Sequence, residues 1–222
     1  MKKNWITKFL GIVVLCLLFS KSANADNLPL KLFGIKIYDD AKLYVDLNDG
    51  KTSELRPGIL SYHHTEEKPF SNLIENSNLD IYRLRTNMLN EVLIVAGSKN
   101  IDSKTSPENF TNKCKTSQKN YKNVLADYYQ VNKKRFIKEY YKAELNNGKI
   151  YLFSTEELEY NKNNKKLVLM IQCSYLNFDN EIYSWLIISL FDKEYFTGST
   201  LLTWKKTEPF DDSLITSNLK GF

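Results

Sequence analysis

The sequence predicts an α+β fold: a mostly antiparallel sheet of about six strands with one long helix packed on a face. Three observations lead to this expectation. Residues 106–130 have the spacing of an amphipathic helix, and short alternating or apolar runs lie on both sides of it. The third is a cysteine pair, Cys114 in the helical pattern and Cys173 in a strand pattern. A helix and a sheet that each bury one face together form a two-layer domain.

The helix at 106–130 has consistent start signals and one apolar side. Ser106 can cap it, Pro107 suits the first helical position, and Glu108 suits the positive end of the helix dipole. Apolar or small residues recur in steps of three and four at Phe110, Cys114, Ser117, Tyr121, Val124, Leu125 and Tyr128. These steps keep one stripe facing the sheet, with Cys114 on it.

Strands are expected before and after this helix. They are expected at 30–38, 60–65, 79–86, 91–98, 149–160, 166–175 and 182–191. Asp39 is expected to cap a short helix at 40–47, which the turn Asn48-Asp49-Gly50 ends. The run 133–145 fits either a helix or an extended edge strand, and its apolar spacing favours a helix. A second short helix is expected at 212–219.

The first 25 residues have the features of a cleaved signal peptide. Lys2 and Lys3 precede an apolar stretch at 9–19, and Ala23-Asn24-Ala25 supplies a cleavage site between Ala25 and Asp26. The apolar stretch is shorter than the roughly 20 residues that span a bilayer as a helix. The sequence therefore predicts a signal peptide at 1–25, a single domain at 26–204 and a polar tail at 205–222, in a periplasmic or secreted bacterial protein with no transmembrane anchor after cleavage.

Charge and composition bear on the class of partner. Four lysines leave with the signal peptide, so the remainder has 27 basic and 26 acidic residues and a formal charge of about +1. This balance gives no support for a nucleic-acid partner. No cofactor is expected, and the predicted partner is a protein or a small molecule of the cell envelope.

The two cysteines that remain after cleavage predict a disulfide. Cys16 leaves with the signal peptide, and Cys114 and Cys173 would meet in an oxidising compartment. Both are predicted to point into the same interior. The alternative, a redox-active thiol pair, is disfavoured because the two residues are far apart in sequence and lie on apolar faces.

Arg83, Arg85 and His63 are the candidate ligand-binding residues. Arg83 and Arg85 share one face of a predicted strand and could hold a carboxylate or phosphate, or pair with acids across the sheet. His63 and His64 alternate faces, so no shared metal site is predicted. The acidic run Glu156-Glu157-Leu158-Glu159 lacks the spacing of a calcium loop and is predicted to lie on a solvated hairpin edge.

No nucleophile, phosphate-loop, dinucleotide or zinc-protease motif occurs in the sequence. No catalytic residue is therefore predicted, and a non-catalytic binding or interaction module is expected. The alternatives are a periplasmic enzyme that uses carboxylates or the histidine pair, and a component of envelope assembly or stress response.

The opening Leu32-Phe33-Gly34-Ile35, followed by Tyr38-Asp39-Asp40-Ala41, resembles the start of a group of uncharacterised small exported proteins of AT-rich marine bacteria. The order of elements is similar too, ending in a strand with Ile171-Gln172-Cys173. The resemblance covers about 15 residues most clearly, and the charged stretch 133–144 departs from it. It implies export and the overall layout, and it carries no activity or binding residues.

Overall fold

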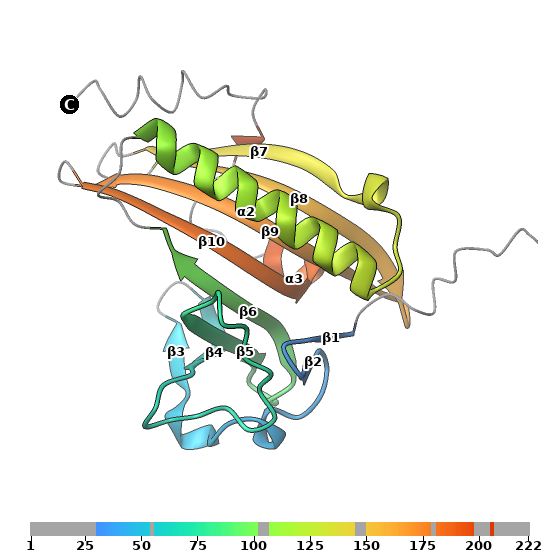
Figure 1. Cartoon of the computed structure of the whole chain (residues 1–222). Helices are drawn as coiled ribbons and strands as arrows, with labels where there is room; N and C mark the ends of the chain where they lie inside the picture. Colours follow the sequence, from blue (N-terminus) through green and yellow to red (C-terminus); the bar gives the residue numbers. More distant parts are fainter. Residues whose placement is uncertain are drawn as a thin grey trace, which may run out of the picture.

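The computed structural model describes residues 30–53, 56–101, 107–144, 150–178, 181–197 and 205–206. Its main element is a nine-stranded antiparallel sheet in the order β11-β7-β8-β9-β10-β6-β5-β4-β3. The long helix α2 lies across one face of the β7–β10 half (Figure 1). We call this side of the sheet the α2 face and the opposite side the far face.

The element bounds follow the chain. The strands are β1 Lys31–Leu32, β2 Ile35–Lys36, β3 Lys51–Ser53, β4 Arg56–His63, β5 Ile81–Asn87, β6 Val92–Asn100, β7 Ile137–Glu144, β8 Ile150–Lys162, β9 Lys165–Phe178, β10 Glu181–Asp192 and β11 Lys205–Lys206. The helices are α2 Pro107–Tyr128 and α3 Lys193–Thr197, with 3-10 turns η2 Ala41–Leu43, η3 Leu47–Asp49 and η4 Lys133–Arg135.

The α2 face of the sheet holds the main core. Leu169, Ile171 and Cys173 of β9 alternate toward α2 and are all fully buried, as the period of two predicts. Leu186 and Ile188 of β10 lie directly opposite Cys173 and Ile171 in the register. This layer confirms the predicted antiparallel sheet with one long helix on a face.

The disulfide lies in the middle of this layer. Cys114 of α2 and Cys173 of β9 are bonded, with their Cα atoms 6.0 Å apart and a sequence separation of 59 positions. Neither cysteine is accessible to solvent. The predicted pairing is thus present in the structure, and it fixes α2 to the centre of the sheet.

The prediction of about six strands agrees only roughly, since the described residues form a sheet of nine. The largest part of this difference in strand number comes from the run 133–145, which is a strand instead of the expected helix. Asn132 caps a single 3-10 turn there, and the chain then extends into β7, which pairs with β8 along its whole length. Phe136 is buried, whereas Ile137 is exposed. Neighbouring apolar residues in this run therefore point to opposite sides, as they do in a strand with one buried and one exposed face. The short strands β3 and β11 account for the rest.

The segment 30–38 is a hairpin of two short strands rather than the single expected strand. Phe33 and Gly34 both have positive φ, 51° and 84°, so the chain reverses there and Leu32 pairs with Ile35. A Cβ atom on Gly34 would lie 2.2 Å from the backbone oxygen of Asn72, so glycine is also needed for this close approach. Gly97 of β6 makes room for the ring of Phe33 in the same way.

The short helix expected at 40–47 is replaced by two 3-10 turns, and Asp39 is not their cap. Asp40 caps η2 by accepting from the Lys42 amide, and Asp46 caps η3 by accepting from the Asn48 amide. Asp39 instead accepts a hydrogen bond from the Tyr44 hydroxyl at 2.8 Å. The two capping aspartates are only six positions apart, which leaves no length for a regular helix between them.

Several sequence predictions fall outside the described residues. These are the signal peptide with its cleavage site at Ala25 and Asp26, the Ser106 cap, and the helix at 212–219. Lys205 and Lys206, from the segment expected as a polar tail, pair with β7 as β11. Among the described helices, none has the length and apolar character needed to cross a membrane.

Candidate functional site

The three candidate binding residues come together on the far face of β3, β4 and β5. His63 of β4 lies directly opposite Arg83 of β5, and Ser61 lies opposite Arg85. On its other side Ser61 lies opposite Lys51 of β3. Directly opposed residues in an antiparallel pair have Cβ atoms about 5 Å apart and point to the same side. Lys51, His63, Arg83 and Arg85 therefore form one group, which we call the basic cluster.

The basic cluster has no acidic counterpart in the described chain. Lys51, His63 and Arg83 are exposed and Arg85 is half-buried. None of the ion pairs formed between described residues includes Lys51, Arg83 or Arg85, so the cross-strand pairing with acids that the sequence left open is not found there. Burial, followed by the charge of Arg83, lowers the pKa of the Arg85 guanidinium.

The protonation of His63 reflects the same group of charges. Partial desolvation, followed by the positive charges of Arg83, Lys51 and Arg85, lowers the pKa of His63 below its usual range. At neutral pH the imidazole is therefore uncharged, and three cations surround it. A bound anion would reverse the electrostatic part of this shift.

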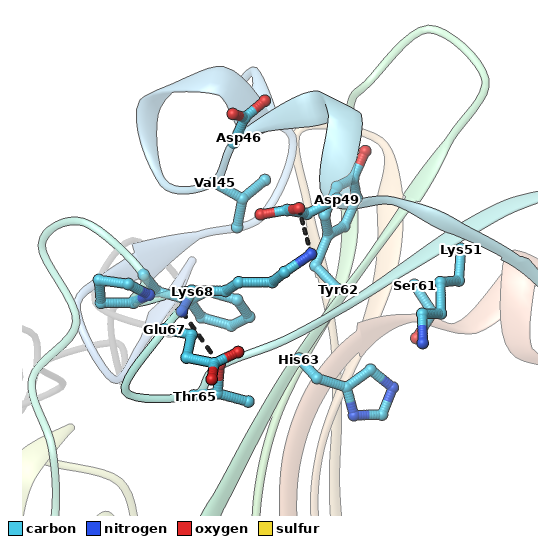
Figure 2. Close-up of a pocket in the computed structure, with 12 residues that line it drawn as sticks. Val45, Asp46, Asp49, Lys51, Ser61, Tyr62, His63, Thr65, Glu67 and Lys68 are labelled. Carbon is cyan, nitrogen blue, oxygen red and sulfur yellow. Dashed lines mark hydrogen bonds and ion pairs between the residues drawn. The ribbon is translucent and has the colours of Figure 1, made fainter.

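A pocket of about 340 Å³ opens beside the basic cluster. Figure 2 shows Lys51, Ser61 and His63 on one side of it, and Lys68 reaching toward Asp49 on the other. Lys68 forms an ion pair with Asp49, and its amide donates to the Thr65 hydroxyl at 3.0 Å. The pocket thus has a basic wall contributed by the cluster and an opposite wall where Lys68 pairs with Asp49 and Glu67 adds a further carboxylate.

The pocket does not have the arrangement of an acid–base catalytic site. Asp49 is held by Lys68, and Asp46 accepts from the amide and side chain of Asn48 at 2.9 and 3.0 Å. No hydrogen bond within the described residues joins His63 to a carboxylate, and Arg83 does not line the pocket. In the same part of the chain, no three His, Cys, Asp or Glu side chains are grouped to hold a metal ion.

His64 has a separate, structural role. Its Nδ1 accepts from the Phe70 amide at 2.9 Å, and its ring packs edge-on against Phe70 and Tyr82. His63 and His64 thus have different surroundings, as the alternation of a strand predicts.

The acidic run at 156–159 is not the solvated hairpin edge that was predicted. β8 is an inner strand between β7 and β9, so both of its faces can be covered. Glu156 is only 7% exposed and forms an ion pair with Lys122 of α2 at 2.9 Å. Glu159, on the other face, pairs with Lys166 and Lys193. These carboxylates are committed to ion pairs within the fold.

Sequence reasoning missed Lys51 and the pocket. Lys51 follows Asn48-Asp49-Gly50, which was read as a turn, and β3 has only three residues. The pocket wall comes from the segment 65–70, which has no regular structure. No periodic signal marks either feature, because both depend on how a short edge strand meets a distant loop.

Comparison with known proteins adds no assignment. No family model, no curated protein and no solved structure matches the chain.

Proposed function

We propose that the chain is an exported, non-catalytic module that binds a small anionic ligand, bearing carboxylate or phosphate groups, at the basic cluster. The observation that carries this proposal is the half-buried Arg85 beside Arg83, with no described carboxylate paired to either. Desolvating a cation without a partner costs free energy, and an anion bound across the two guanidinium groups would offset that cost. Export is supported by the signal-like start of the sequence and by the buried disulfide.

The dimensions of the basic cluster define the size of the ligand. It covers two strand spacings from β3 to β5, about 10 Å, and two residues along β5, about 7 Å. Such an area suits a compact molecule with two or three anionic groups. Arginine holds a carboxylate or phosphate through two parallel N–H bonds, whereas Lys51 adds a point charge at the edge.

Replacing Arg83 and Arg85 together by glutamine should weaken the binding of citrate and pyrophosphate about 100-fold. Each hydrogen bond to a charged group contributes about 1.5–3 kcal/mol, and the double variant removes the charge from two donors. Isothermal titration calorimetry in low-salt buffer measures the affinity of both probes, since salt screens exposed charges.

Arg135→Gln is the matched control, because Arg135 is an exposed arginine in η4, outside the cluster. It should bind both probes as the unchanged chain does. The proposal is contradicted if neither probe binds saturably to the unchanged chain, or if the control loses as much affinity as the double variant.

Sulfate should raise the pKa of His63. The cations of the cluster contribute to lowering this pKa, so an anion bound among them favours the charged imidazolium. By linkage, anion affinity should then increase as pH falls through the pKa of His63. Proton NMR titration of the imidazole signals, in sulfate and in chloride at equal ionic strength, measures the shift; sulfate keeps its charge over this range.

His64 is the internal control, because its Nδ1 is already engaged by the Phe70 amide. Equal movement of both histidines would indicate a general salt effect and would argue against a bound anion at the cluster.

A further inference from the structure

A groove of about 840 Å³ runs along α2, on the opposite side of the sheet from the basic cluster. One wall is the side of α2 that carries residues 112–124, and the other is the end of β6 with the segment 76–78. Three exposed asparagines lie on its two sides, Asn78 on one and Asn112 and Asn120 of α2 on the other, and Asn100 lines it at the end of β6. Figure 1 shows the end of β6 and the first half of α2 at the same end of the sheet, with β10 between them.

The groove floor is apolar. Leu186 of β10 and Ile101 are 2% and 8% exposed and line it together with Tyr121 of α2. The Tyr121 hydroxyl donates to the Asn76 side chain at 3.2 Å, which closes the groove at that point. An apolar floor with primary amides on both rims offers hydrophobic contact below and paired donors and acceptors above, which is the pattern that a peptide backbone requires.

The end of β6 in the groove has backbone groups that no described residue pairs. Its pairing with β5 stops at Ser98, opposite Ile81, whereas its pairing with β10 continues to Asn100. The Ile101 amide donates to Ser184 of β10, and the Ser98 carbonyl accepts from Asp80 on the β5 side. Because backbone groups alternate sides along a strand, the N–H and C=O of Asn100 point toward the β5 side. No described residue pairs with them there.

The length and charge of the groove define its occupant. Residues 112–124 of α2 span about 18 Å, which matches about five residues of extended chain. Lys99 and Lys113 line the groove, and no described lining residue is acidic. We propose that this groove binds an extended peptide segment of another protein, neutral or acidic in its side chains, which pairs as a strand with Asn100. This site is independent of the anion site and does not rest on it.

Selection from a phage-displayed random heptapeptide library tests the proposal. The full folded chain is the target, and selected peptides are then measured against Asn120→Trp, which fills the groove. Lys119→Trp is the matched control, since Lys119 is the exposed neighbour on α2 that does not line the groove. Selected peptides should bind the unchanged chain and the control alike, and should bind Asn120→Trp at least about tenfold more weakly, a loss of roughly 1.4 kcal/mol. Thr116→Trp, on the same rim, should repeat the loss.

A second readout tests the strand pairing itself. Bound peptide should slow hydrogen exchange of the Asn100 backbone amide, because that N–H becomes a donor in the new pair. The proposal fails if no peptide sequence is enriched, if enriched peptides bind Asn120→Trp as tightly as the control, or if exchange at Asn100 is unchanged. Enrichment of strongly basic peptides would also contradict it, because the groove contains two lysines.

Discussion

Replacing Cys114 and Cys173 together by alanine should lower the free energy of unfolding by about 4 kcal/mol. The bond closes a loop of 59 residues, so its loss releases a large part of the chain in the unfolded state. Alanine is the suitable replacement because both positions are fully buried, where a serine hydroxyl would need a partner. Urea denaturation of the oxidised chain and of the variant, followed by circular dichroism, measures the difference.

Reductant provides the control for this experiment. It should shift the unfolding midpoint of the unchanged chain toward that of the variant and leave the variant unaffected. A loss of less than about 1 kcal/mol would contradict the prediction, since it would mean that the loop is already restricted in the unfolded chain.

Elements of this fold are predicted correctly from the sequence where the local pattern fits only a helix or only a strand. The helix at 107–128 was predicted within two residues at each end, because its start signals and its apolar stripe agree. The run 133–145 was wrongly predicted as a helix, since Phe136, Ile137, Tyr140 and Tyr141 fit both the helical and the strand period. Its pairing with β8 decides the outcome, and that contact depends on residues up to 20 positions away. Tertiary pairing thus overrides a weak local preference.

The basic cluster, our candidate binding site, is predicted only in part. Arg83 and Arg85 were placed on one strand face by simple alternation, and the register adds His63 beside them. Lys51 joins only because β3 pairs with β4, and sequence spacing gives no indication of that pairing. The groove beside α2 depends on three separate segments, so none of its asparagines stands out in the sequence. Strand faces are local properties, whereas pockets are formed by the arrangement of distant elements.

Ile171→Ala should lower the free energy of unfolding by about 3 kcal/mol. Ile171 is fully buried on the α2 face of β9, directly opposite Ile188 of β10. Its carbonyl accepts from Gln118 Nε2 of α2 at 2.9 Å, which places the helix directly over this position. The truncation would therefore leave a cavity where helix and sheet meet. Urea denaturation measures the loss, and Ile137→Ala is the matched control, since Ile137 is 59% exposed and its truncation should change stability by at most about 0.5 kcal/mol.

The same substitution in the variant that lacks Cys114 and Cys173 separates two roles of the disulfide. If the bond acts mainly by restricting the unfolded chain, α2 stays on the sheet without it, and Ile171→Ala should again cost about 3 kcal/mol. A much smaller cost in that background would mean that the helix no longer packs over Ile171. The bond would then be required to hold α2 in place, and with it the groove that α2 forms with β6.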